Sequence, residues 1–146
     1  MVLYKAHGNT AVLDANSNFT ITHPVWGSHI RSKVTSDAQG WVNIPIIIQS
    51  ETGRKLKLTK VEVSYATGWK TIFDAIKVYM GQQEILNKSD FGFSNDKETT
   101  VDFEVPNSPQ IDRGIAISVL ITIPAGPDEH GRWATISSVG AHLCAV

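Results

Sequence analysis

Apolar and polar residues alternate along much of the chain, which is typical of β-strands. Between positions 101 and 105 apolar residues alternate with Asp102 and Glu104, as in a strand with one face in water. Apolar residues also occupy every second position from 115 to 123, and the residues between them are small or apolar. We therefore expect 115–123 to form a central strand of the core, with both of its faces covered.

Four further segments have the composition of strands: 19–23, 41–47, 56–65 and 133–139. In the segment 56–65 the apolar phase slips by one residue between Leu58 and Val61. This slip predicts a β-bulge, which would bend the strand at that point.

The segment 69–80 fits two periodicities. Its large apolar residues recur at helical spacing: Trp69, Ile72, Phe73, Ile76, Tyr79 and Met80. Its β-branched residues and the flanking Gly68 and Gly81 favour a strand instead. In that strand the residues at positions 72, 76, 78 and 80 would share one face, interrupted by Asp74. We predict a strand.

Short turn sequences separate these segments, at 15–18, 36–40, 51–54, 81–83, 94–97, 107–109 and 126–128. Seven or more short strands with such spacing are typical of a sandwich or a barrel. No repeat or linker divides the chain. The sequence therefore predicts an all-β protein: one antiparallel β-sandwich domain over residues 1–146, with a jelly-roll-like arrangement.

Composition and charge narrow the classes of partner. The 13 basic and 14 acidic residues nearly cancel and form no dense basic cluster, so nucleic acid is not a predicted partner. The longest apolar runs are far shorter than the roughly 20 residues of a membrane-spanning helix, so no membrane partner is predicted either. The first residues lack the pattern of a signal peptide, and Cys144 has no second cysteine to pair with. These features predict a cytoplasmic protein.

Segment 23–31 holds the largest number of neighbouring side chains that could bind a ligand. It contains Trp26, whose indole could stack on a sugar ring, and His29 and Arg31, which would share one face of a strand. In the alternative interpretation Trp26 plugs one end of the sandwich and the polar side chains face water. His23 and His29 match no standard spacing of metal ligands, so no metal site is predicted here.

A second polar group lies in segment 127–133, between two predicted strands. We expect His130, Arg132 and Trp133 to contact a ligand if this connection is a long hairpin loop. Asp128 and Glu129 are weak calcium candidates, because the spacing of an EF-hand is absent. The alternative is a solvated hairpin. A combined site with Trp26, His29 and Arg31 requires both segments to lie at the same end of the fold.

The other candidate residues point to no catalysis. Asp102 and Glu104 share the wet face of a strand outside any catalytic motif, and Cys144 with His142 lacks a third orienting group. No phosphate loop, nucleophile elbow or dinucleotide fingerprint occurs in the chain. We therefore predict no catalytic residues and no cofactor.

Three motifs together carry a resemblance: His7-Gly8-Asn9, Trp26-Gly27-Ser28 with Arg31 downstream, and the central segment 74–81, DAIKVYMG. They resemble a family of small bacterial and fungal β-rich proteins of uncharacterised function. The resemblance covers most of the chain and implies no catalytic or binding residues. The central segment and the strand near 114–124 are also similar to parts of jelly-roll modules that bind carbohydrate, a likeness of fold rather than of function.

The sequence predicts a non-catalytic binding module for a small polar ligand, with carbohydrate as the leading class. The predicted ligand-binding residues are Trp26, His29, Arg31, His130, Arg132 and Trp133. One alternative is a self-associating structural protein, a homo-oligomer whose exposed strand edges pair between copies. The other is a small metal-free enzyme of the cyclase or lyase type, with a histidine as general base.

Overall fold

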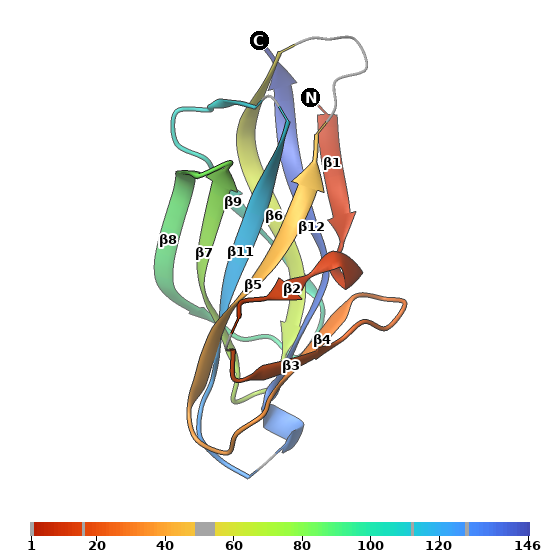
Figure 1. The fold of residues 1–146 in the computed structure, drawn as a ribbon, viewed down its shortest axis with the longest axis vertical. Coiled ribbons are helices and arrows are strands. Elements are labelled where there is room, and N and C mark those ends of the chain that lie inside the picture. The colour runs from red at the N-terminus through yellow and green to blue at the C-terminus, as the bar shows by residue number, and fades with distance from the viewer. Residues whose placement is uncertain (1, 16, 49–54, 112, 128) are drawn as a thin grey trace.

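Two antiparallel sheets lie face to face in this protein (Figure 1). The computed structural model describes residues 2–15, 17–48, 55–111, 113–127 and 129–146. The turn predicted at 51–54 lies outside the described residues. The predicted all-β sandwich is confirmed.

The larger sheet has seven strands, with β12 (Trp133–Ala145) at its centre. β6 (Leu56–Thr67) pairs with one edge of β12, and β1 (Val2–His7) and β4 (Ser28–Ser32) pair with the other edge. The remaining strands extend both sides of the sheet: β9 (Thr99–Glu104) and β10 (Gln110–Ile111) beside β6, and β3 (Phe19–Thr22) beside β4. Because β1 pairs with β12, the two ends of the chain lie at the same end of the molecule (Figure 1).

The smaller sheet has five strands in the order β2-β5-β11-β7-β8. They are β2 (Val12–Leu13), β5 (Ala38–Ile47), β11 (Gly114–Ile123), β7 (Ile72–Met80) and β8 (Gln83–Phe93). Two 3₁₀ turns, η1 (Gly8–Thr10) and η2 (Glu129–Gly131), complete the described elements. No helix of the described residues is long and apolar enough to cross a bilayer.

The core lies between the sheets and is filled by every second residue of the long strands. On β5, Val42 and Ile44 are fully buried, whereas Trp41 and Asn43 on the opposite face are only partly buried. Each fully buried aliphatic side chain contributes about 1.5–3 kcal/mol of transfer free energy. At one end of the core Phe73 packs edge-to-face on Phe91, with ring centroids 5.0 Å apart. One continuous cluster of buried side chains therefore joins the two sheets.

The irregularity predicted in segment 56–65 is present in β6. Leu143 pairs with Leu58 while His142 pairs with Lys60, which leaves Thr59 as the extra residue of a bulge. This confirms the slip predicted between Leu58 and Val61.

In segment 69–80 the prediction of a strand is right, but one detail is wrong. The strand begins at Ile72, and its register shifts around Asp74. The shift turns Phe73 into the core and leaves Ile72 partly exposed, so Ile72 does not share the inner face with Ile76.

Strand β11 lies between β5 and β7, as a central strand should. Its inward residues are buried, but Ala116, Leu120 and Thr122 on its outer face are only partly so. The expectation that both faces are covered is therefore wrong for the outer face, where the largest side chains come from β5 and β7.

Candidate functional site

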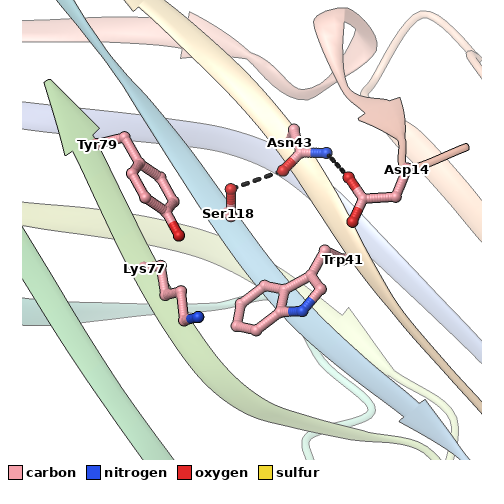
Figure 2. A pocket seen from close by; sticks show the side chains of 6 residues that line it. All are labelled: Asp14, Trp41, Asn43, Lys77, Tyr79 and Ser118. Carbon is pink, nitrogen blue, oxygen red and sulfur yellow. Dashed lines mark hydrogen bonds between the residues drawn. The ribbon is translucent and has the colours of Figure 1, made fainter. Parts of the chain in front are cut away.

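A pocket opens on the outer face of the five-stranded sheet (Figure 2). It has a volume of about 320 Å³ and is lined by Asp14, Trp41, Asn43, Lys77, Tyr79 and Ser118. Trp41 and Asn43 come from β5, Ser118 from β11, and Lys77 and Tyr79 from β7, while Asp14 follows β2. We call this the sheet pocket.

The alternation of the strands places these side chains on one face. Trp41 and Asn43 lie on either side of the buried Val42, and Lys77 and Tyr79 lie on either side of the buried Val78. In the register of the sheet, Ser118 pairs with both Asn43 and Lys77. The polar and aromatic groups of three adjacent strands therefore meet over the middle of the sheet.

Hydrogen bonds fix the polar side of the sheet pocket. The Asn43 Nδ2 donates to Asp14 Oδ1 at 2.6 Å, and the Ser118 hydroxyl donates to Asn43 Oδ1 at 2.6 Å. Asn43 is thus held by both ends of its amide, and Asp14, which is exposed, has a second carboxylate oxygen beside it (Figure 2). This arrangement presents acceptors and donors in fixed positions before any ligand arrives.

Aromatic rings form the other side. The Lys77 Nζ lies 5.1 Å from the centroid of the Trp41 ring, within the range of a cation–π contact. The same ammonium is 3.9 Å from Glu84 Oε1, an ion pair that is partly exposed and therefore weak. Since Lys77 is positive and Asp14 is negative, the charges that line the pocket balance.

A second pocket adjoins the sheet pocket and shares Tyr79 with it. It has a volume of about 370 Å³ and extends over Pro45, Ile47 and Ala116 toward Arg113. Because Tyr79 lines both pockets, the two adjoin each other on the outer face of the five-stranded sheet.

The residues predicted from segment 23–31 also come together with those of segment 127–133. Trp133 pairs with Arg31 and Thr135 with His29 across β12 and β4. The His29 ring stacks on Trp133 with centroids 6.0 Å apart, and Trp26 meets the His29 ring edge-on at 6.3 Å. The two segments therefore do lie at the same end of the fold.

The individual roles differ from those predicted. Arg31 Nε donates to His29 Nε2 at 2.9 Å, which confirms that both lie on one strand face. Trp133 Nε1 donates to the backbone oxygen of His130 at 2.8 Å, so its polar group is engaged within the protein. His130 itself lies exposed in η2.

Arg132, which the sequence predicts to contact a ligand, is buried inside the protein. Its side chain is 1% exposed. Nε donates to the backbone oxygen of Pro124, and Nη2 donates to those of Val34 and Ser36. The guanidinium thus ties the loop after β4 to the loop after β11, because a fork of donors can reach several carbonyls at once.

The calcium candidates receive no support from the structure. Asp128 lies outside the described residues. The Glu129 carboxylate lies 3.9 Å from Arg31 Nη1. Within the described part of the chain, one group of three ligating side chains is close enough for a metal, and Glu129 is not in it.

That group consists of Glu62, Asp102 and His142, whose ligating atoms lie within 4.8 Å of one another. Lys5 Nζ lies 3.6 Å from Glu62 and Lys60 Nζ 3.5 Å from Asp102. Because both carboxylates already face ammonium groups, we interpret the group as an ion-pair cluster on the outer face of the seven-stranded sheet.

The pH dependence of stability should report the state of His29. Burial, and then the positive charge of Arg31, lower the pKa of His29 below its ordinary value of 6.5. Below pH 6.5 the unfolded chain therefore binds a proton that the folded chain resists, so this contribution to stability is intact above pH 6.5 and falls as pH drops through the lowered pKa. Between pH 7.5 and pH 5, the free energy of unfolding measured in urea should fall more for the native protein than for His29→Gln. Equal losses in the two proteins would contradict this assignment.

Comparison with known proteins adds a fold class. No family model and no curated protein matches the chain in sequence. Among solved structures it is similar to a low-affinity xylan-binding module of family 86 from Roseburia intestinalis, with a TM-score of 0.59 and 14% identity, over 99% of this chain and 97% of that one. It is also similar to a xylan-binding module of family 15, with a TM-score of 0.57 and 12% identity, over 98% and 97% of the two chains.

A family 35 carbohydrate-binding module from Clostridium thermocellum is similar at a TM-score of 0.54 and 7% identity, over 97% of this chain and 98% of that one. At these identities the likeness concerns the fold alone. The chain therefore has the jelly-roll β-sandwich fold that these carbohydrate-binding modules share, and they match it over nearly their whole length.

Proposed function

We propose that this protein is a non-catalytic carbohydrate-binding module that holds a polysaccharide chain in the sheet pocket. The observation that supports this most is the presence of Trp41 and Tyr79 on the outer face of a sheet, beside a fixed set of hydrogen-bonding groups. Sugar rings have apolar faces and polar edges. An indole or phenol ring packs against the face, while amide, carboxylate and ammonium groups bind the hydroxyls at the edge.

The charges and shape of the site indicate the class of sugar. The opposite charges of Lys77 and Asp14 favour a neutral polymer over a polyanion. The adjoining pocket gives room for a second sugar beyond Tyr79. Two of the similar modules are described as xylan-binding, so xylan is the first polymer to test.

The proposal is tested by electrophoresis in native gels that contain a soluble polysaccharide. Separate gels would hold xylan, galactomannan, β-glucan or no polymer, and each would carry the native protein, Trp41→Ala and Leu3→Ala. Leu3 is an exposed apolar residue of β1, outside the pocket, and serves as the matched control. We expect at least one polymer to retard the native protein and Leu3→Ala, and to retard Trp41→Ala less.

Equal migration in all gels would overturn the proposal. Unchanged retardation of Trp41→Ala would place binding outside the sheet pocket. The same mixtures assayed for new reducing ends would detect cleavage, which a non-catalytic module does not produce.

Self-association and a cytoplasmic location stay predictions from the sequence. Light scattering of the purified protein measures the first directly, with and without the polymer that retards it.

A further inference from the structure

A second group of aromatic side chains lies on the opposite side of the molecule from the sheet pocket. His29 and Arg31 flank the buried Ile30 on β4, and Trp133 precedes the buried Ala134 on β12, so all three face outward from the seven-stranded sheet. The sheet pocket faces outward from the five-stranded sheet. Because the core lies between the sheets, the two groups are on opposite faces of the sandwich.

Trp69 adds a fourth ring to this group, and two glycines show how closely its indole and that of Trp133 pack on the backbone. A Cβ on Gly131 would lie 2.8 Å from Trp69 Cε2, and a Cβ on Gly68 would lie 2.9 Å from Trp133 Nε1. The two indoles therefore rest directly on neighbouring backbone. The rings of Trp26, His29 and Trp133 contact one another in that order, and Trp69 lies against Gly131, two residues before Trp133. We call these four rings the aromatic surface.

The outer members of the aromatic surface are open to solvent. Trp26 is 52% exposed and Trp69 is 63% exposed. The phenylalanines of β7, β8 and β9, in contrast, pack in or against the core. The contact with His29 holds Trp26 in place, so its exposed indole has little freedom to lose on binding, whereas the Lys70 ammonium lies 4.7 Å from the centroid of the Trp69 ring.

Polar groups border the aromatic surface in a way that suits neutral hydroxyls. His29 Nε2 accepts a hydrogen bond from Arg31, so the proton of the neutral ring lies on Nδ1. Arg31 and Glu129 form a loose pair, with 3.9 Å between Nη1 and Oε2, and both side chains are about half exposed. Such a pair supplies a donor and an acceptor side by side, and its opposite charges do not favour an ionic ligand.

We propose that the aromatic surface is a second carbohydrate-binding site, which takes the ring face of a neutral pyranose against Trp26 and holds its hydroxyls with Arg31 and Glu129. The inference rests on the proposed function for its class of ligand, but on none of the residues of the sheet pocket. Since the two sites face opposite ways, one protein could hold two polysaccharide chains at once. Binding to a polymer would then exceed binding to a short oligosaccharide through avidity.

The four tryptophans allow a direct test by nuclear magnetic resonance. Each indole N–H gives its own ¹⁵N–¹H signal, and single Trp→Ala or Trp→Phe variants assign the four signals. The native protein is titrated with xylohexaose, and with mannohexaose and cellohexaose in parallel. We expect the signals of Trp26 and Trp41 both to move and to saturate at different ligand concentrations.

Two variants separate the sites. Trp26→Ala should weaken binding at the aromatic surface by about tenfold and leave the titration of the Trp41 signal unchanged. Glu129→Gln keeps the shape of the side chain and should weaken only the Trp26 titration, by a few-fold.

The possible results distinguish the two proposals. Movement of the Trp41 signal alone would overturn the second site and leave the sheet pocket in place. Movement of the Trp26 signal alone would support the second site and contradict the sheet pocket. If no signal moves with any hexasaccharide, both proposals fail.

Discussion

Replacing Trp41 with alanine is expected to weaken binding of xylohexaose at the sheet pocket by about 10- to 100-fold, which corresponds to about 1.4–2.7 kcal/mol. The indole is the largest side chain that lines the pocket, and its loss also frees Lys77 from the ring that it contacts. Isothermal titration calorimetry measures the change.

The fold should tolerate this substitution, because Trp41 faces outward and is only partly buried. Thermal unfolding of Trp41→Ala should therefore stay close to that of the native protein. Leu3→Ala is the control for loss of apolar surface elsewhere. An affinity within twofold of native for Trp41→Ala would contradict the assigned role of the indole.

Replacing Arg132 with methionine is expected to destabilise the protein by about 3–5 kcal/mol. Methionine preserves much of the apolar stem but donates no hydrogen bond. The backbone oxygens of Pro124, Val34 and Ser36 would each lose the hydrogen bond from the guanidinium, although that of Val34 would keep the one from the Ser32 hydroxyl. Urea unfolding gives the change in free energy.

Arg31→Met is the matched control, since Arg31 is half exposed and its ion pair is loose. We expect that variant to unfold within about 1 kcal/mol of the native protein. A cost below about 1 kcal/mol for Arg132→Met would contradict the structural role. Loss of sugar binding in a stable Arg132→Lys variant would restore the role predicted from the sequence.

The class of fold could be predicted because the inward positions of the long strands are filled by aliphatic residues with a period of two. Strand β11 shows this most clearly, with five such residues buried in succession on one face. Strand β8 was harder to predict, because it lies at an edge of its sheet and most of its residues face solvent. Its run from Asn87 to Asp90 is entirely polar and lacks the alternation of the other strands. Pairing with β7 makes it a strand.

The candidate site was less accessible to sequence reasoning. Two short segments of the sequence hold several residues that can recognise a ligand: Trp26, His29 and Arg31 in the first, and Trp133 in the second. The pairing of β4 with β12 brings those segments together. The residues of the sheet pocket come from four separate segments, and only the register of β5, β11 and β7 joins them. A signal was nevertheless present, since Trp41 and Tyr79 are large aromatic residues at outward positions of strands.

Two residues that are adjacent in the sequence, Arg132 and Trp133, differ in burial. The sequence predicts a shared role for Arg132 and Trp133, but successive residues at the start of a strand point to opposite sides. Arg132 therefore turns inward to the backbone of two loops, while Trp133 turns outward to His29. The sequence shows that both residues carry hydrogen-bond donors, but it does not show in which direction each side chain points.

The most direct measurement is a crystal structure of the protein with xylohexaose, or with the hexasaccharide of whichever polymer retards it in the gel. Our account predicts a sugar ring packed against Trp41 or Tyr79, with a hydroxyl hydrogen-bonded to Asp14, Asn43 or Lys77. An oligosaccharide bound elsewhere on the protein, with the sheet pocket free of sugar, would contradict it.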